Sequence, residues 1–251
     1  MEKLTSLKNP KVMLWRSLKD RKSRRESGLF LVEGRRMTEE AIRSSFPVHA
    51  LLLAEEAAPL ENIPAGIPVY QLSSGVLAAV CDTRTPQGYA AVLESTSLPV
   101  SGDRLLILDD VQDPGNVGTM MRTADCAGFD SLVLSGGCAD LFSPKVLRST
   151  MGSIFRVPAA IAEDLPEYLR RLKQDGFSII ASELNGDPFY PNAPRDGKIA
   201  LVIGNEGNGI SQAVSACATH HLKLPMRGGA ESLNAAVAAG IMMYDLMRNA
   251  G

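Results

Sequence analysis

The 251-residue sequence contains few cysteines and histidines and no long apolar run, and these shortages exclude several classes of protein. Its four cysteines stand far apart without a CxxC pair, and its three histidines make no metal-ligand spacing with them. We therefore expect reduced thiols, no metal site and a cytoplasmic protein. Because no run of about 18 apolar residues is present, we expect no membrane span. Residues 1–6 also lack the apolar core of a signal peptide.

The charges are distributed unevenly along the chain. The formal net charge is −2, but residues 1–36 contain eleven Lys or Arg against four Asp or Glu, a local charge of +7. A basic N-terminal segment on an otherwise acidic chain indicates a polyanionic partner such as RNA. A solvated charged helix face is the alternative, and charge alone does not decide between them. The cations that could contact RNA phosphates are Lys11, Arg21, Lys22, Arg24, Arg25 and Arg35.

Two regions are expected, 1–98 and 99–251, with a polar linker at 94–99 that ends in proline. The first reads as a mixture of short helices and strands, and Trp15 and Phe30 fit its core better than a base-stacking surface. In the second region apolar strands alternate with helices, which predicts a mainly parallel α/β sheet covered on both faces. Its strands are expected at 105–108, 132–134, 178–181, 200–203 and 222–224. Its helices are expected at 117–127, 144–151, 165–174, 210–218 and 233–248.

Three polar loops follow strands of this second region, at the edge of the sheet where ligands of α/β proteins bind. The first is Asp109-Asp110-Val111-Gln112-Asp113-Pro114-Gly115-Asn116, which leads into a helix that carries Arg122. Asn116 stands where an N-cap is expected, and Arg122 is expected to point along the helix towards a site. A capped helix with a surface arginine is the alternative.

The second loop, Gly204-Asn205-Glu206-Gly207-Asn208-Gly209, has the spacing GxxGxG rather than the GxGxxG of dinucleotide-binding proteins. Glu206 would also repel a pyrophosphate at the start of the following helix. The loop therefore favours a ligand with hydroxyl groups or positive charge. A tight structural turn is equally compatible with it, and a nucleotide-dependent dehydrogenase is disfavoured.

The third loop is Leu224-Pro225-Met226-Arg227-Gly228-Gly229-Ala230-Glu231-Ser232-Leu233-Asn234. Its glycine pair allows close approach of another backbone or a ligand. Ser232 and Asn234 stand at the start of an alanine-rich helix, where capping and ligand contact compete for the same atoms.

Together these loops resemble the three ordered motifs of the SpoU (TrmH-type) RNA 2′-O-ribose methyltransferases, of the SPOUT class. The resemblance spans about residues 104–249 and rests on three elements: Asn116 with Arg122-Thr123-Ala124, the glycine loop around Glu206, and Leu224-Pro225-Met226 with Ser232-Leu233-Asn234. Residues 1–98 resemble the RNA substrate-binding domain often fused to this class, a small α/β domain similar to ribosomal proteins.

The resemblance implies an S-adenosylmethionine cofactor, a deep trefoil knot in the C-terminal part of the chain, and a homodimer. It assigns the cofactor-binding main chain to Gly204, Leu224, Met226 and Leu233. It assigns the polar active-site positions to Asn116, Arg122, Glu206, Ser232 and Asn234. Position 236 is Ala where the family often has Ser, and Leu224 stands where Ile is common; neither change removes a polar role.

The predicted function is methyl transfer from S-adenosylmethionine to a ribose 2′-OH of structured RNA, with rRNA of the 23S type favoured by the separate basic region. A tRNA 2′-O-methyltransferase and a non-catalytic RNA-binding knot protein are the alternatives. Two roles are open for Arg122. The family proposal makes it the activator of the hydroxyl, whereas the stable positive charge of a guanidinium also fits a clamp on an RNA phosphate.

Overall fold

The computed structural model describes residues 1–96 and 99–248, and the chain divides into two compact units. The first unit comprises Met1–Thr96 and Asp140–Phe155; the second lies within Ser97–Ala139 and Arg156–Gly251. The expected boundary after residue 98, and residues 97–98 of the expected linker, lie outside the described residues. The expected second region was wrong in one respect, because Asp140–Phe155 belongs to the first unit.

The first unit is built on a five-stranded mixed sheet with the order β1-β4-β3-β5-β2. Its strands are β1 (Glu2–Leu4), β2 (Leu29–Glu33), β3 (Val48–Ala54), β4 (Val69–Leu72) and β5 (Tyr89–Glu94). β1, β4 and β3 pair in parallel, whereas β5 runs antiparallel to both of its neighbours. The short edge strand β1 was not predicted from the sequence.

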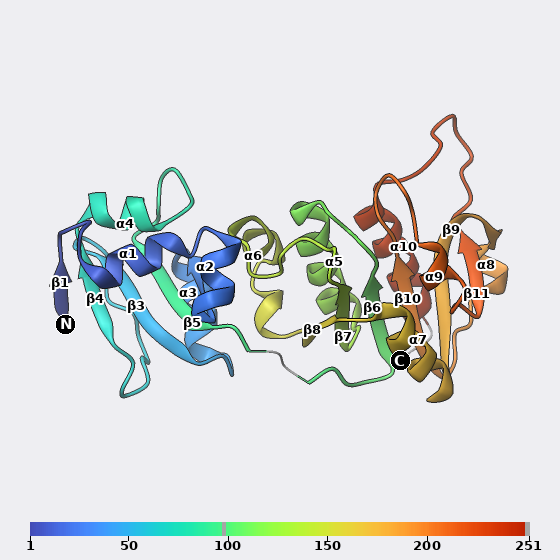
Figure 1. The fold of residues 1–251 in the computed structure, drawn as a ribbon, viewed down its shortest axis with the longest axis horizontal. Coiled ribbons are helices and arrows are strands. Elements are labelled where there is room, and N and C mark those ends of the chain that lie inside the picture. The colour runs from blue at the N-terminus through green and yellow to red at the C-terminus, as the bar shows by residue number, and fades with distance from the viewer. Residues whose placement is uncertain (97–98, 249–251) are drawn as a thin grey trace. The chain divides into compact units, whose positions relative to one another are not determined.

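Helices and loops cover both faces of this sheet (Figure 1). They are α1 (Pro10–Ser17), α2 (Arg21–Ser27), α3 (Arg35–Arg43), α4 (Ser74–Val80), α6 (Pro144–Thr150) and the short 3₁₀ helix Ser153–Phe155. The core on one face is formed by α1, α4 and the inward-facing strand residues, with Trp15 only 2% exposed. Phe30 is fully buried. Both aromatic side chains therefore lie in the core, as predicted.

Asp140–Phe155 belongs to the first unit because its side chains complete that unit's packing. Phe142 packs against Phe30 with ring centroids 4.5 Å apart, and Phe155 meets Phe46 edge-on at 5.6 Å. These contacts join residues far apart in sequence, so no local pattern could have revealed them.

The second unit has a six-stranded parallel sheet with the order β11-β9-β10-β6-β7-β8. Its strands are β6 (Arg104–Leu108), β7 (Ser131–Ser135), β8 (Ala159–Ala162), β9 (Phe177–Pro188), β10 (Lys198–Ile203) and β11 (His220–Lys223). The predicted parallel α/β sheet is confirmed. β8 was missed, and β9 continues to Pro188, beyond its expected end at residue 181.

Helices cover both faces of the parallel sheet. On one face, α7 (Leu165–Gln174) and α9 (Gln212–Ser215) contribute to a core that includes Leu169 and Val214. On the other, α5 (Pro114–Ala127) packs against β7, and α10 (Ala235–Met247) packs against α5 and β10. Figure 1 shows α10 beside β10. The short helix α8 (Phe189–Asn192) follows β9. No helix of the described residues is long and apolar enough to cross a membrane.

The helices α5 and α10 meet at Gly240. A Cβ atom on Gly240 of α10 would lie 3.4 Å from Cγ2 of Thr123 on α5, which is van der Waals contact. Because the strands run in parallel, the loops after β6, β10 and β11 start at the same edge of the sheet. The fold therefore gathers the three polar loops at one edge.

Candidate active site

One side chain from each of the three loops takes part in a single chain of hydrogen bonds centred on Asn116. The Asn116 side chain is almost fully buried. Its Nδ2 donates to Oε1 of Glu206 at 2.8 Å, and its Oδ1 accepts from Nδ2 of Asn234 at 3.0 Å. These bonds span 90 and 118 residues of sequence. The three loops are therefore physically connected at Asn116.

Asn116 can make these contacts because it does not cap its helix. The expected N-cap role was wrong: Asp113 is the N-cap of α5, and its Oδ1 accepts from the main-chain N–H of Asn116 at 2.9 Å. Pro114 then occupies the first helical position, where its missing N–H has no consequence. Asn116 lies one turn inside, with its side-chain amide directed to the other two loops.

Glu206 is held by donors from the first loop. Its carboxylate accepts from the main-chain N–H groups of Gln112 and Asp113, each at 3.2 Å, as well as from Asn116. Burial alone would raise the pKa of Glu206, but the hydrogen bonds from Asn116 and the main chain outweigh it, and the pKa is lowered. The carboxylate therefore stays charged and occupies N–H groups that could otherwise bind a phosphate.

The glycine loop after β10 is a tight turn. Asn205 and Gly209 exchange two main-chain hydrogen bonds of 2.9 Å, and Gly209 has a φ of +70°. A Cβ atom on Gly204 would lie 2.3 Å from the carbonyl carbon of Gly209, so only glycine fits there. The structural-turn interpretation of this loop is correct, and the same turn presents Glu206 to the first loop.

The sequence interpretation missed two side chains that tie the first loop to the second, those of Asn205 and Asp109. Nδ2 of Asn205 donates to the main-chain carbonyl of Asp110 at 2.8 Å, and Oδ2 of Asp109 accepts from the main-chain N–H of Ser211 at 2.8 Å. Asp110 has a left-handed backbone with a φ of +56°, which is unusual outside glycine. The sequence signal that could have indicated these contacts is the pair of aspartates, Asp109 and Asp110, directly after a buried strand.

The third loop caps α10 through Asn234, not through Ser232. Oδ1 of Asn234 accepts from the main-chain N–H groups of Ala236 and Val237 at 2.9 and 3.2 Å. The same side chain thus caps a helix and, through its amide nitrogen, contacts Asn116. Ser232 is exposed, and no hydrogen bond to it occurs in the described parts of the chain. The interpretation of Ser232 as a cap is therefore wrong.

Arg122 is exposed on α5 and is not part of the chain of contacts around Asn116. Within residues 1–96 and 99–248 its guanidinium has no hydrogen bond or ion pair. It shares one face of α5 with Thr119, Thr123 and Cys126, at the helical spacing of three and four residues. The structure thus leaves this cation available for an external anion.

Residues 225–233 are exposed and extend from the end of β11 to the start of α10. Leu224, which precedes them, is buried, whereas Met226 and Leu233 are 37% and 39% exposed. In the described structure the main-chain N–H and C=O groups of 225–233 make no hydrogen bonds. These exposed backbone groups can bond to water or to a polar ligand.

Asn116 and Asn234 lie in the wall of a cavity of about 530 Å³ between α5 and α10. The rest of its lining is mostly apolar and includes Thr119, Thr123, Val237, Ile241 and Tyr244. This volume falls in the range of ~300–1,000 Å³ typical of sites for small organic molecules. The site therefore combines a few fixed polar groups with apolar walls.

The six cations expected to bind RNA all lie in the first unit, and they differ in availability. Arg21, Lys22 and Arg25 are exposed on α2. Lys11 forms an ion pair with Glu2 at 2.7 Å, and Arg35 pairs with Glu39 at 2.8 Å. These five remain candidates for phosphate contacts.

Arg24 does not have the role expected from the sequence. Its side chain is 7% exposed and forms an ion pair with Asp140 at 2.5 Å. Nη1 also donates to the carbonyls of Leu18 and Lys19, at 2.6 and 2.7 Å. A guanidinium whose donors are committed to buried protein groups is structural, so Arg24 is removed from the set of RNA contacts.

Two family models match this chain. The SpoU rRNA Methylase family model matches residues 103–244, and the MRM3-like substrate binding domain model matches residues 9–91. The curated 23S rRNA (guanosine(2553)-2′-O)-methyltransferase RlmP of Bacillus subtilis (strain 168) is 40% identical over 247 residues, which cover 98% of this chain and 99% of that protein.

Solved structures of related proteins superpose on nearly the whole length of this chain. An AdoMet-bound rRNA methyltransferase from Sinorhizobium meliloti superposes with a TM-score of 0.90 at 30% identity, covering 98% of this chain and 97% of that one. The SpoU methyltransferase AviRb from Streptomyces viridochromogenes, in complex with AdoMet, gives a TM-score of 0.86 at 28% identity, covering 97% and 98%. With all three motif loops joined in one structure, this chain belongs to the SpoU rRNA methylase family.

Proposed function

We propose that this protein is a cytoplasmic enzyme that transfers a methyl group from S-adenosylmethionine to a ribose 2′-OH of large-subunit (23S-type) rRNA. The observation that carries the proposal is the hydrogen-bonded chain Glu206–Asn116–Asn234, which unites the family's three motifs in one site. The 40% identity to a 23S rRNA 2′-O-methyltransferase over nearly the whole chain supports the reaction and the substrate.

The residues at the carboxyl edge of the parallel sheet fit this cofactor. S-adenosylmethionine supplies an electrophilic methyl group when it is bound. Gly204, Leu224, Met226 and Leu233 would hold it through main-chain groups, and the unpaired main chain of 225–233 provides donors and acceptors for the adenine and ribose. The apolar side chains that line the neighbouring cavity are partly exposed, and covering them would exclude water and so strengthen electrostatic interactions inside the site.

The protein's own side chains orient the reacting groups. The charged Glu206 carboxylate fixes the Asn116 amide, so that Oδ1 of Asn116 faces Asn234 and Nδ2 faces Glu206. Such preorganisation of polar groups contributes to catalysis because they need not reorient during the reaction. Arg122, on the exposed face of α5, would bind the phosphate next to the target ribose. Its role as activator of the hydroxyl, proposed for the family, is the alternative assignment.

We further propose that the enzyme is a homodimer with a trefoil-knotted second unit. The α10 helix leaves large apolar side chains in solvent: Val237 is 51% exposed, Ile241 38% and Tyr244 56%. They line the cavity that contains Asn116 and Asn234. A second copy that covered this face would bury apolar surface and close the site at the same time.

The test is a methylation assay with labelled S-adenosylmethionine on protein-free 23S rRNA, 16S rRNA and tRNA, followed by mapping of 2′-O-methyl positions. We expect one modified ribose in 23S rRNA, and none when the Arg122→Ala variant is used. Modification of tRNA alone would favour the tRNA alternative. Binding of S-adenosylmethionine by calorimetry separates an enzyme with another RNA substrate from a non-catalytic RNA-binding protein, for which no binding is expected.

A further inference from the structure

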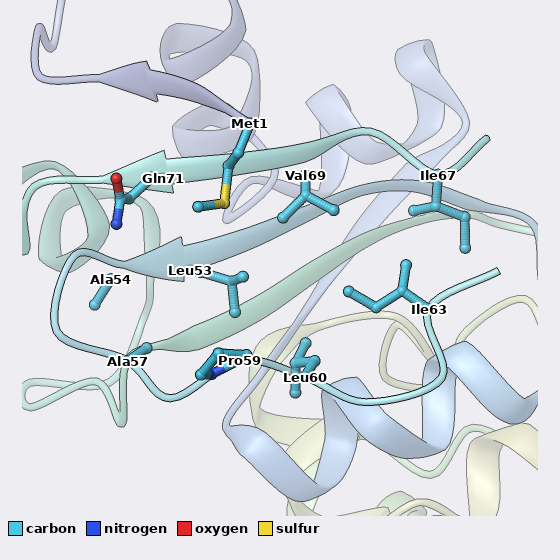
Figure 2. Close-up of a pocket in the computed structure, with 10 residues that line it drawn as sticks. All are labelled: Met1, Leu53, Ala54, Ala57, Pro59, Leu60, Ile63, Ile67, Val69 and Gln71. Atoms are coloured by element: carbon cyan, nitrogen blue, oxygen red, sulfur yellow. The ribbon is translucent and has the colours of Figure 1, made fainter. Parts of the chain in front are cut away.

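The first unit contains a cavity of about 460 Å³, and Figure 2 shows the ten residues that line it. It is lined by β3 and β4 and by the connection between them, residues 55–68. The walls are almost entirely aliphatic, with Leu53, Leu60, Ile63, Ile67 and Val69 among the lining residues. The cavity is open to solvent, and Met1 at its edge is 77% exposed.

The cavity arises because no helix covers this part of the sheet. Leu53 and Tyr89 lie on one face of the sheet. The helix α3 packs against β5, β2 and β3, and α6 packs against β2. Over β3 and β4, the irregular segment 55–68 covers the sheet in place of a helix. Figure 2 shows Pro59, Leu60 and Ile63 of this segment facing Leu53 and Val69 of the strands. The surface is therefore partly covered but not filled.

The chemistry of these walls does not suit a nucleobase. Gln71 is the only polar side chain among the ten that line the cavity, and its Nε2 donates to the main-chain carbonyl of Glu55 at 3.3 Å. No aromatic ring lines the cavity. Unpaired bases are usually held by stacking on aromatic rings and by hydrogen bonds to their polar edges. Burying those edges against aliphatic walls would leave them unsatisfied, which is unfavourable.

The charges near the cavity are the reverse of those on the N-terminal helices. Residues 44–83 contain no Lys or Arg, and Glu55, Glu56 and Glu61 of the covering segment are exposed. Lys3 pairs with Glu55 at 3.2 Å, and Arg35, which pairs with Glu39, interacts electrostatically with Glu61. Among residues 1–96 and 99–248, Glu56 accepts one hydrogen bond, from the hydroxyl of Ser74 at 3.3 Å. Lys3 neutralises Glu55, whereas Glu56 and Glu61 keep a surplus of negative charge at the rim, which disfavours RNA phosphates.

From this combination we infer that the cavity binds an apolar side chain carried by a basic polypeptide segment of another protein. The inference rests on the proposed function, because a protein that occupies the same RNA substrate must be rich in Lys and Arg to neutralise phosphates. Its apolar residue would fill the aliphatic cavity, and the flanking cations would meet the glutamates of the rim. The first unit would then bind both the RNA and a protein that is bound to the same RNA.

The test replaces Ile63 with the photo-crosslinker p-benzoylphenylalanine in the full chain. Irradiation is carried out with large-subunit ribonucleoprotein particles and, separately, with the protein-free RNA extracted from them. We expect crosslinks to a protein peptide whose linked apolar residue is flanked by Lys or Arg. Crosslinks to RNA in either sample, crosslinks only to a peptide without such cations, or no crosslink at all would overturn the inference.

Two variants examine the two parts of the surface. Ile63→Ser with Ile67→Ser changes the apolar wall, and Glu56→Lys with Glu61→Lys reverses the rim charge. Each double variant should weaken association with the particles about tenfold, which corresponds to ~1.4 kcal/mol of binding free energy. Truncation of an anchor residue at an interface typically costs at least this much. Ile161→Ser and Glu163→Lys, exposed positions of the second unit, are the matched controls. Unchanged association of both pairs, with folding verified by thermal unfolding, would refute the proposal.

The outcome is separable from that of the proposed function. Methylation of protein-free 23S rRNA depends on the second unit and on RNA contacts, so the variants at the cavity should leave its rate unchanged. If the wild-type protein methylates no RNA, the proposed function fails whatever the crosslinks show. If methylation proceeds and the crosslinks reach no basic protein segment, the inference alone fails.

Discussion

The side-chain amide of Asn234 donates to the side-chain oxygen of Asn116 at 3.0 Å, although 118 residues separate them in sequence. The bond also fixes the orientation of Asn116, because its nitrogen must then face Glu206. Asn234 itself is fixed as the cap of α10. The hydrogen bond therefore fixes the position of the start of α10 relative to the first turn of α5.

Replacing Asn116 with aspartate tests this arrangement. Asn116→Asp removes the donor to Glu206 and places a second carboxylate at the same 2.8 Å distance. We expect loss of methyl transfer and a stability loss of ~1–3 kcal/mol, larger than that of Asn116→Ala, since like charges repel. Urea unfolding and rates of methyl transfer provide the measurement, with the exposed Asn185→Asp as control. An aspartate variant as stable and active as wild type would rule out the role of this contact.

Arg122 should be needed for methyl transfer and not for folding or cofactor binding. Arg122→Ala removes an exposed cation without a protein partner in the described structure, so its unfolding transition should not move. We expect methyl transfer to fall by a factor of ~10²–10³, a typical loss for a group that stabilises developing charge. Arg170→Ala, an exposed arginine on α7, should behave as wild type.

The variant Arg122→Lys separates the two roles open for this residue. A phosphate clamp requires only positive charge, so lysine should keep part of the activity with an unchanged pH profile. If the side chain accepts the proton of the hydroxyl, the profile should move to lower pH. The reason is that the pKa of lysine, about 10.4, is well below that of arginine.

Glu206 should contribute to the acid sensitivity of the second unit. Its pKa is lowered in the folded protein because, although burial raises it, hydrogen bonds from Asn116 and the main chain have the larger effect. Stability from such a group is present above the unfolded-state pKa, about 4.3, and is lost as the pH falls towards the lower folded-state pKa. Urea unfolding of Glu206→Gln should therefore show less loss of stability below about pH 4.3 than the wild type. Glu163→Gln serves as the control, and identical pH dependence of all three proteins would contradict the prediction.

Gly204 should tolerate no side chain. A methyl group there meets the main chain of Gly209 at 2.3 Å, and main-chain atoms cannot move aside as a flexible side chain can. We expect Gly204→Ala to lower the unfolding free energy by ~1–3 kcal/mol and to weaken cofactor binding. Gly229→Ala has no atom within 4 Å of the added Cβ and should stay within ~0.5 kcal/mol of wild type. Equal stabilities in thermal unfolding would show that the turn can relax.

We expect Arg24 to contribute to the stability of the first unit and not to RNA binding. Arg24→Ala leaves the Asp140 carboxylate, 19% exposed, without its cationic partner, which we expect to cost ~3–5 kcal/mol. Lys22→Ala removes an exposed cation of the same helix, whose ion pair with Glu26 is long at 3.8 Å, and should change stability by less than ~0.5 kcal/mol. Chemical unfolding measures both. An Arg24→Ala protein of normal stability that binds RNA weakly would restore the expected phosphate contact.

Much of the second unit could be predicted because its strands are short apolar runs bounded by turn residues. The motifs singled out Asn116, Glu206 and Asn234, which the structure joins by hydrogen bonds, but they did not reveal the other partners of these side chains. Asp113 and Asn116 are both good capping residues three positions apart, and the sequence could not show that the first caps the helix. The extension of β9 was missed because Gly186 and Pro188 are atypical of strands. A Cβ atom on Gly186 would lie 2.5 Å from the carbonyl carbon of His221, a close approach between two strands that no local pattern reveals.

The first unit was harder to predict because it is completed from elsewhere in the chain. Phe30 looked like a core residue, but the ring of Phe142 that covers it comes from within the stretch matched by the methylase family model. Arg24 looked like its basic neighbours on α2. Its ion pair with the partly buried Asp140, 116 residues away, distinguishes it from them.

The contribution of Asp140–Phe155 to the first unit has a consequence for recombination between related genes. A crossover near residue 98 would exchange the N-terminal module but leave Asp140, Phe142 and Phe155 of the parent behind. The incoming module would then have to match an acid and two aromatic rings that it did not bring. Natural or engineered chimaeras with a new RNA specificity should therefore succeed when both pieces, residues 1–96 and 140–155, come from the same donor.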